Sequence, residues 1–165
     1  MDKEALFYEP LAKQQVRCTL CPHRCKLKDG QSGVCRVRYN KAGKLCTSVY
    51  GRFAALNTDP VEKKPLYHFY PGRQVFSVGS LGCNLSCSFC QNWQIAHCTP
   101  GDVRRMRQAT PQKLVHEAQA IPGNMGIAFT YNEPIVWYGY MLDIAREAQA
   151  RGLKTIMVSN GYIEQ

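Results

Sequence analysis

A chain of 165 residues has room for one compact domain, or for one small domain and part of another. Its hydrophobic fraction of 45% is that of a globular protein, and no stretch approaches the roughly 18 apolar residues that a membrane span needs. The net charge of +9 comes from residues 1–110, where 17 Lys and Arg face 7 Asp and Glu. Because no run of five or six basic residues occurs, we expect these bases to offset thiolate charge or to face solvent rather than to bind nucleic acid.

The chain also contains nine cysteines. It begins MDKEALFYEP, a segment that has charges and lacks the apolar run of a secretion signal. We therefore expect a cytoplasmic protein without membrane attachment, whose thiols stay reduced and do not pair as disulfides. Cysteines in such a setting bind metals or are buried as small apolar side chains.

The first cysteine cluster occupies the string CTLCPHRCKLKDGQSGVC. Four thiols fall within 18 residues, three of them in the pattern Cys-x2-Cys-x3-Cys and one after a glycine-containing turn: Cys18, Cys21, Cys25 and Cys35. So short a segment cannot bury much core, and a bound metal would explain how it keeps its shape. Zinc held by four sulfurs and an iron–sulfur cluster both fit this pattern, and four free thiols on a surface turn are the remaining alternative.

The segment after the first cluster contains an isolated cysteine and then several prolines. Cys46 is isolated in LCTSVYG, and we expect it to be buried in a strand. Residues 51–72 contain three prolines, which forbid a long helix, so we expect an irregular connector there. We place a boundary near Pro71, between a cysteine-rich segment with its connector (residues 1–70) and a second unit (residues 71–165).

Strands and helices alternate beyond this boundary. Strands are expected at residues 74–78, 126–130 and 153–158. One helix is expected to begin at Pro111, with Thr110 as its N-cap, and to end before Pro122. A longer helix is expected from Pro134 to Gly152, because apolar residues recur there at steps of three and four. This alternation implies right-handed crossovers and a parallel sheet, and therefore an α/β fold.

A distinctive string follows each expected strand. GCNLSCSFCQNW follows the first strand, TYNEP the second and SNG the third. Ligands of parallel sheets lie at the carboxyl ends of the strands. We therefore expect the three strings to meet at one edge of the sheet.

The first of these strings carries Cys83, Cys87 and Cys90, separated by three and two residues. Three thiolates at this spacing can bind three irons of a [4Fe–4S] cube and leave the fourth iron without a protein ligand. Most iron–sulfur electron carriers use four cysteines, so the open iron indicates a site for a further ligand, of which S-adenosylmethionine (SAM) is the best known. A zinc knuckle built on the same triad needs a fourth ligand, and neither His97 nor Cys98 has a tight knuckle spacing.

The triad string, including Phe89 just before its last cysteine, resembles the signature of the radical SAM enzymes. More of the chain resembles the radical SAM enzyme of the AmmeMemoRadiSam system, a relative of the pyruvate formate-lyase-activating enzymes. The strings that carry this resemblance are CTLCPHRCKLKDGQSGVC, DPVEKKPLYHFYPG, GCNLSCSFCQNW, AFTYNEP and VSNGY. They extend along nearly the whole chain.

The resemblance implies roles for individual residues. The three cysteines of the triad would ligate the [4Fe–4S] cluster. Glu133 would hold the amino group of SAM, for which a carboxylate is the natural partner. Glu133 stands in TYNEP, where the family has Gly-Gly-Glu-Pro, so Tyr131 and Asn132 replace two glycines here.

Three further residues receive cofactor roles from the same resemblance. Ser159 and Asn160 match a segment that lies near the ribose and carboxylate of SAM. Phe89 would shield the cluster and flank the adenine. No catalytic residue is assigned beyond these and the cluster.

The family fold is a partial (β/α)6 barrel, and this chain reaches only the third strand. The resemblance therefore implies the N-terminal half of such a barrel, preceded by the small cysteine-rich segment, and a fragment of a longer protein. The later strands of the family complete the adenine pocket and much of the substrate site, so we do not expect this half to be fully active alone.

The implied function is reductive cleavage of SAM to a 5′-deoxyadenosyl radical that abstracts hydrogen from a substrate, either a protein glycine, as in the activating enzymes, or a small molecule. The implied partners are a flavodoxin- or ferredoxin-like electron donor and Memo-like and AMMECR-like proteins. Two alternatives stay open: an iron–sulfur electron carrier that is indifferent to SAM, and a basic zinc module that binds RNA.

Overall fold

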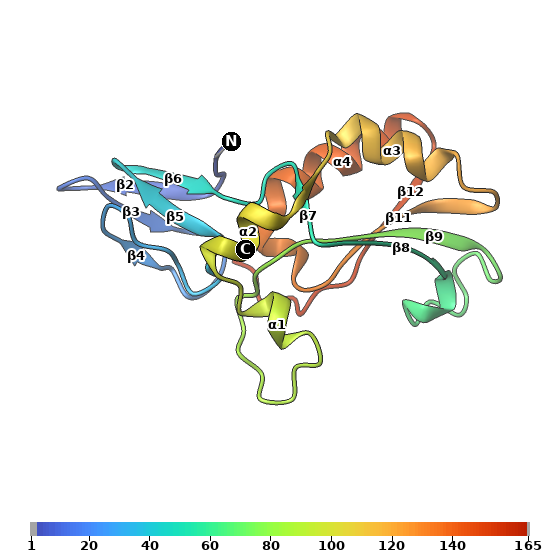
Figure 1. Ribbon diagram of the computed structural model, residues 1–165, viewed down its shortest axis with the longest axis horizontal. Helices are drawn as coiled ribbons and strands as arrows, with labels where there is room; N and C mark the ends of the chain where they lie inside the picture. The colour runs from blue at the N-terminus through green and yellow to red at the C-terminus, as the bar shows by residue number, and fades with distance from the viewer. Residues whose placement is uncertain (1–2, 165) are drawn as a thin grey trace.

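The computed structural model describes residues 3–164, which form two lobes (Figure 1). A small lobe of short strands, coloured blue to cyan, carries the first cysteine cluster. A larger lobe carries a four-stranded sheet with two helices on one side of it. The α/β architecture that the alternation of elements predicts is therefore present.

The small lobe is built from two antiparallel sheets, with strand orders β1-β6-β5 and β2-β3-β4. The strands are β1 Lys3–Glu4, β2 Tyr8–Leu11, β3 Gln15–Cys18, β4 Lys26–Leu27, β5 Arg38–Lys41 and β6 Lys44–Thr47. Cys46 is buried in β6, as predicted. Val16, Leu20, Leu27 and Leu45 are each at most 5% exposed, so the lobe has a small apolar core that the short cysteine segment did not lead us to expect.

Residues 51–72 are more regular than the prolines suggest. They contain β7 Arg52–Phe53, β8 Ala55–Pro60 and a 3-10 helix over Val61–Lys63. β8 pairs antiparallel with β9 (Gln74–Gly79), from Ala55 opposite Gly79 to Pro60 opposite Gln74. The proline is tolerated because it ends a strand at the edge of the described sheet. The sheet therefore includes residues that precede the boundary expected near residue 71.

The sheet of the larger lobe has the strand order β12-β11-β9-β8. β11 spans Asn124–Thr130 and β12 spans Lys154–Met157. Both neighbours of β11 run parallel to it, with Ala128 opposite Ser77 of β9 and Ile156 of β12. The predicted parallel pairing is confirmed, and the carboxyl ends of these three strands lie along one edge of the sheet.

The helices are α1 Trp93–Ala96, α2 Pro100–Arg105, α3 Pro111–Gln119 and α4 Tyr138–Ala150. As expected, Thr110 caps α3 by accepting a hydrogen bond from the backbone N–H of Lys113 at 3.2 Å. The helix expected from Pro134 instead begins as a 3-10 helix over Pro134–Trp137 and continues as α4. A short strand β10, Arg107–Gln108, pairs with β7. No helix in the described part of the chain has the length and apolar character to cross a membrane.

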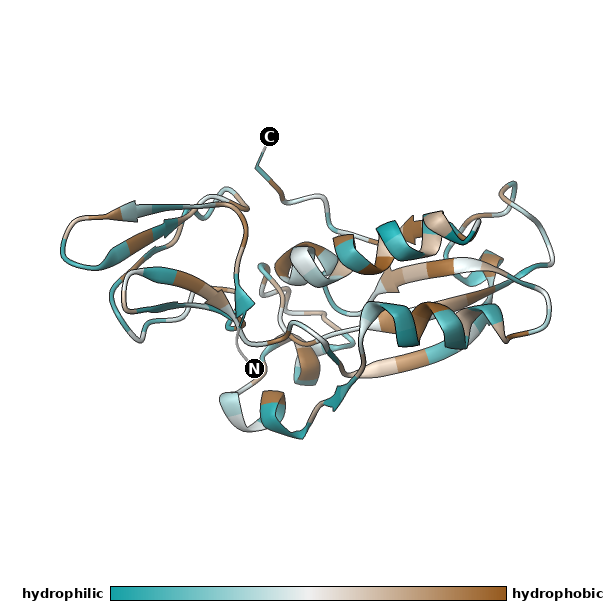
Figure 2. Cartoon of the chain, turned by 90° about the horizontal axis from the view of Figure 1, so that it is seen from above, coloured by the Kyte–Doolittle hydropathy of each residue, from teal (hydrophilic) through white to brown (hydrophobic). Residues whose placement is uncertain are grey.

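The main core lies between the sheet and the helices α3 and α4, which cover the same face of it (Figure 1). In Figure 2 these helices carry both polar and apolar segments, as helices with one buried face do. The core residues from the sheet are Phe76, Val78, Ile127 and Phe129, and those from α4 include Tyr140 and Ile144. Val37 and Val49 belong to this same core and are fully buried, so the two lobes are packed together.

The opposite side of the sheet holds a buried ion pair. Nζ of Lys64 donates to Asp59 at 2.9 Å, and both side chains are at most 4% exposed. Ser77 donates to the same carboxylate at 3.1 Å, and the exposed Lys63 donates to its other oxygen at 2.7 Å. Burial by itself raises the pKa of Asp59, but hydrogen bonds from these three residues hold it below its usual value. The pair joins the segment after β8 to the sheet.

Replacing Lys64 with Met is expected to lower the free energy of unfolding by about 3 kcal/mol, because the Asp59 carboxylate stays buried without its main partner. The matched change Lys63→Met removes an exposed partner of the same carboxylate and should cost under about 1 kcal/mol. Urea unfolding at neutral pH measures both, and equal losses would contradict the assignment.

The stability of the folded chain should also depend on pH through Asp59. Since the folded pKa of Asp59 is lowered, its contribution to the free energy of unfolding is present above the unfolded pKa of about 3.9 and is lost as the pH falls through the folded pKa.

Candidate functional site

The predicted cysteine triad lies in the loop between β9 and α1, which extends from the side of the sheet opposite α3 and α4 (Figure 1). Cys83 and Cys90 are partly buried, whereas Cys87 is exposed. The backbone N–H of Leu85 donates to the sulfur of Cys83 at 3.4 Å, and the N–H of Cys90 donates to the carbonyl of Cys87 at 3.2 Å. The loop therefore turns back on itself between its first and last cysteines.

The residue before the triad explains how this loop meets the small lobe. Gly82 has a φ of +91°, and a Cβ atom on it would lie 2.6 Å from the carbonyl oxygen of Cys35. The side chain of Val37 would be in contact as well. Only glycine fits there, because the triad loop begins pressed against the turn that carries the last cysteine of the first cluster.

Glu133 brings two of the predicted SAM-binding strings together. Its side chain is 2% exposed and follows β11. One carboxylate oxygen accepts from the backbone N–H of Ile135 at 3.0 Å and from Oγ of Ser159 at 2.8 Å. The other accepts from the backbone N–H of Asn160 at 2.7 Å. The TYNEP and SNG strings therefore do meet, through the charged group expected to hold SAM.

Asn84 joins the triad loop to the same cluster of residues, and the sequence analysis did not identify it. It is 1% exposed. Its side-chain oxygen accepts from Nδ2 of Asn160 at 3.0 Å, and its side-chain nitrogen donates to the carbonyl of Tyr162 at 2.8 Å. The only sequence feature that could have pointed to Asn84 is its position directly after Cys83. The neighbouring residues do not indicate which partners its side chain finds.

Asn84 also contacts the small lobe. Nε2 of His23 is 2.7 Å from the carbonyl oxygen of Asn84, so this nitrogen carries the hydrogen, because a carbonyl only accepts. The His23 ring also makes an edge-to-face contact with Tyr162, with 5.2 Å between the ring centroids. A continuous chain of contacts therefore runs from Glu133 through Asn160 and Asn84 to His23.

The triad lies within electrostatic reach of Glu133. Burial raises the pKa of the Cys83 thiol, and the charges of Glu133, Cys90 and Cys87 raise it further, while the hydrogen bond from Leu85 lowers it. Because its pKa is raised, the Cys83 thiol keeps its proton more tightly than a free cysteine does. A cation beside these groups, such as an iron ion or an ammonium group, would favour the thiolate and lower that pKa.

The polar side chains at the strand ends fit the needs of a [4Fe–4S] cluster and SAM in kind and number. Both polar atoms of the Asn132 side chain are buried and have no partner among the described residues. The Glu133 carboxylate accepts three hydrogen bonds and has room for about one more. An amide without partners and an acceptor with a free position fit a polar ligand with an amino group. Three cysteine thiols in one loop fit a cluster with one open iron.

Two features of the predicted site are not assembled in the structure. Within residues 3–164, no three His, Cys, Asp or Glu side chains stand where they could hold a metal ion, so the triad thiols do not converge. The Phe89 side chain, expected to shield the cluster, is 85% exposed. The loop is thus anchored at Asn84, while its tip from Cys87 to Phe89 faces solvent.

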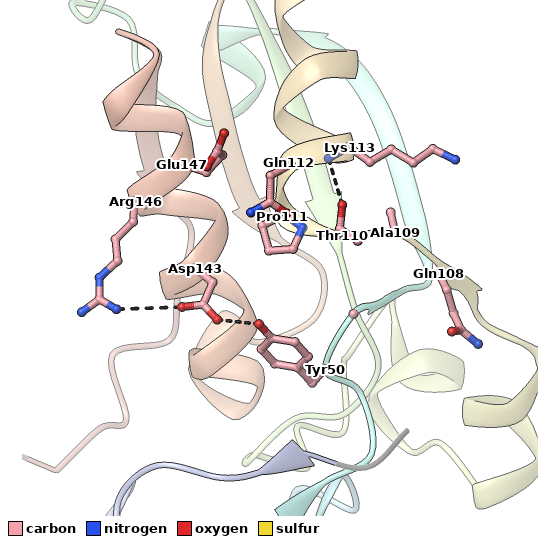
Figure 3. A pocket seen from close by; sticks show the side chains of 11 residues that line it. Tyr50, Gln108, Ala109, Thr110, Pro111, Gln112, Lys113, Asp143, Arg146 and Glu147 are labelled. Carbon is pink, nitrogen blue, oxygen red and sulfur yellow. Dashed lines mark hydrogen bonds and ion pairs between the residues drawn. The ribbon is translucent and has the colours of Figure 1, made fainter.

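A cavity of about 950 Å³ lies between the first turn of α3 and one side of α4 (Figure 3). Tyr50, Lys113, Asp143 and Arg146 line it, and the Tyr50 hydroxyl donates to Asp143 at 2.5 Å. None of the residues from the three strand-end strings lines this cavity. We therefore do not assign the candidate functional site to this cavity, although it is large.

Comparison with known proteins assigns the class. The sequence pattern of the radical SAM superfamily matches residues 77–164, more than half of the chain, and the chain belongs to that superfamily. The match includes the cysteine triad, TYNEP and SNG.

A relative by sequence is an uncharacterised protein of Methanocaldococcus jannaschii, which is 44% identical over 164 residues. The alignment takes in 99% of this chain and 48% of the relative, so the chain spans about half the length of the protein it matches. No solved structure matches the chain.

Replacing Glu133 with Gln should lower the free energy of unfolding by about 2 kcal/mol. The amide nitrogen of Gln would replace a carboxylate oxygen that accepts a hydrogen bond, so two donors would face each other in a buried place. The control Glu9→Gln changes an exposed carboxylate whose partner Arg17 is 3.4 Å away, and it should cost under about 1 kcal/mol. Urea unfolding of the two variants measures the difference. A neutral Glu133→Gln would show that these three hydrogen bonds do not hold the strand ends together.

Proposed function

We propose that this chain is the cofactor-binding half of a radical SAM enzyme of the AmmeMemoRadiSam system, related to the pyruvate formate-lyase-activating enzymes. The observation that carries the proposal is the contact of Glu133 with Ser159 and Asn160 at the strand ends, within electrostatic reach of Cys83. Membership of the radical SAM superfamily supports it. The finer assignment rests on the five strings that resemble the AmmeMemoRadiSam enzyme.

In this proposal Cys83, Cys87 and Cys90 hold a [4Fe–4S] cluster with one open iron. A cluster held there would supply the one electron whose transfer to SAM gives methionine and a 5′-deoxyadenosyl radical. Glu133 accepts a hydrogen bond from the amino group of SAM through its remaining acceptor position. Asn132 offers an amide donor and an amide acceptor, which at present have no partner among the described residues.

The other strand-end residues position these groups. Ser159 and the backbone of Asn160 fix the rotamer of Glu133, and Asn160 ties Asn84 to the same edge. The resemblance implies that Ser159 and Asn160 would also lie near the ribose and carboxylate of SAM. Phe89 is exposed, and in this proposal its side chain would cover the cluster and flank the adenine.

The reaction we propose is abstraction of a hydrogen atom from a substrate, either a glycine of a protein or a small molecule. The electron comes from a flavodoxin- or ferredoxin-like donor in the cytoplasm. Memo-like and AMMECR-like proteins are the proposed partners of the system. The rest of the substrate site belongs to the remaining strands of a partial (β/α)6 barrel, of which this chain supplies the N-terminal half.

The test is the electron paramagnetic resonance spectrum of the anaerobically reconstituted and dithionite-reduced chain, with and without SAM. We expect a [4Fe–4S]+ signal that changes shape when SAM is added, because SAM then occupies the open iron. Cys87→Ala removes an exposed thiol without disturbing the core and should abolish the signal. Ser88→Ala, in the same exposed turn, should leave it unchanged.

Two results would contradict the proposal. A cluster signal that is indifferent to SAM would point to an electron carrier. A chain that binds no iron at Cys83, Cys87 and Cys90 would exclude the radical reaction altogether.

A further inference from the structure

The four cysteines of the first cluster line one small cavity in the small lobe. Cys18, Cys21, Cys25 and Cys35 come from three separate turns and strands, yet all four border the same space of about 20 Å³. Cys18 and Cys35 are less than 9% exposed, and the other two are partly buried. The cavity has no connection with the triad thiols, none of which lines it.

Backbone hydrogen bonds hold the first three of these cysteines in a fixed arrangement. The N–H of Cys18 donates to the carbonyl of Cys25 at 3.0 Å, so the two residues face each other at the end of the β3–β4 hairpin. Between them, the N–H of Arg24 donates to the carbonyl of Cys21 at 3.0 Å and closes a tight turn. A cysteine, two or three residues and a second cysteine across such a turn is the arrangement that zinc knuckles use.

The fourth cysteine is supplied by a second turn that lies over the hairpin. The N–H of Arg36 donates to the carbonyl of Gly33 at 2.9 Å, and the N–H of Gly33 donates to the carbonyl of Arg38 at 2.8 Å. A Cβ atom on Gly33 would lie 3.4 Å from the sulfur of Cys25, so this turn comes directly onto the hairpin sulfurs. Cys35 reaches the cavity from there.

An orphaned donor at the cavity points independently to an anionic occupant. Arg38 lines the cavity and is 3% exposed, and its Nε–H is buried without a partner among the described residues. Its terminal nitrogen donates to the carbonyl of Leu6, which fixes the guanidinium in place. A buried cation with an unused donor costs free energy unless a negative group faces it. Metal-bound thiolates would be such a group.

From these observations we propose that Cys18, Cys21, Cys25 and Cys35 bind one zinc ion as four thiolates. Four thiolates are a common ligand set of structural zinc, and the narrow space between these side chains suits one ion better than an eight-atom [4Fe–4S] cube. The four sulfurs do not converge in the described structure, so they must turn inward to reach the tetrahedral distance of about 2.3 Å. Each thiol releases its proton to solvent on binding. Arg38 offsets part of the resulting charge of the site.

The zinc site would also fix the first residues of the triad loop. Asn84 lines the same cavity as Cys21, and His23, inside the Cys21 turn, donates to the Asn84 carbonyl. Groups that contact a metal ligand in this way orient it and are oriented by it. Zinc would therefore act as a structural ion that holds the small lobe against the candidate active site. The assignment of zinc does not depend on the proposed function.

The test uses the 165-residue chain with Cys83, Cys87 and Cys90 all replaced by Ala, so that no cluster can form on the triad. This protein is titrated anaerobically with Co²⁺ as the probe and then with Zn²⁺. We expect one Co²⁺ per chain, with the intense sulfur-to-cobalt charge-transfer bands and visible absorption of a tetrahedral thiolate site, and full displacement by Zn²⁺. Circular dichroism confirms that each variant is folded.

Two further substitutions in that background locate the ion. Cys21→Ala removes a partly buried thiol and should lower the affinity for Co²⁺ at least 100-fold. Cys98→Ala removes a buried thiol outside the cavity and should leave the affinity and the spectrum unchanged.

The proposal is overturned if the chain without the triad binds no stoichiometric Co²⁺, or if Cys21→Ala binds it as tightly as its parent. An iron–sulfur spectrum in that same protein after reconstitution with iron and sulfide, with no retained zinc, would assign a second cluster instead. None of these outcomes bears on the triad, whose three cysteines are absent from the experiment.

Discussion

Asn84 is the residue through which the triad loop, the end of β12 and the small lobe are joined. Three hydrogen bonds meet there. The Asn84 side chain accepts one from Asn160 and donates one to the carbonyl of Tyr162. Its backbone carbonyl accepts the third from His23. Each contributes on the order of 1 kcal/mol net, but Asn84 is 1% exposed, so the loss of any partner leaves a buried polar group unpaired. The arrangement therefore forms as a whole or not at all.

Glu133 imposes a second constraint on the same edge of the sheet. A carboxylate that is 2% exposed is stable only with several donors, and the chain supplies them from two segments that are 26 residues apart. This requirement holds the SNG string against TYNEP in the absence of any cofactor. The side chains at the strand ends are therefore fixed by their own hydrogen bonds, whereas the tip of the triad loop at Phe89 is exposed.

Much of the larger lobe can be predicted from the sequence because its signals are local. Thr110 and Pro111 mark the beginning of α3, and the apolar spacing after Pro134 marks α4. The meeting of TYNEP with SNG follows from a general rule about parallel strands. β8 was missed because it lies in a segment with three prolines and is stabilised by pairing with β9, which is a tertiary interaction.

The parts of the site that the sequence could not predict depend on the path of the chain between elements. No pattern indicates that the side chain of Asn84 turns toward Asn160, or that His23 reaches its carbonyl. The spacing of the first four cysteines predicts a common site, but the orphaned Nε–H of Arg38 beside it is visible only in three dimensions. Residue types predict which chemical groups a site contains, whereas packing decides which partners the buried polar groups find.

The most direct test of this account is a double-mutant cycle between Asn84 and Asn160, read by urea unfolding of Asn84→Ala, Asn160→Ala and the double variant. The account predicts a coupling free energy of about 1 kcal/mol or more, because the two side chains share a hydrogen bond inside one buried network. A control cycle between Asn84 and the exposed Gln112 should be additive. Additivity within about 0.3 kcal/mol for Asn84 and Asn160 would contradict the claim that this network joins the triad loop to the strand ends.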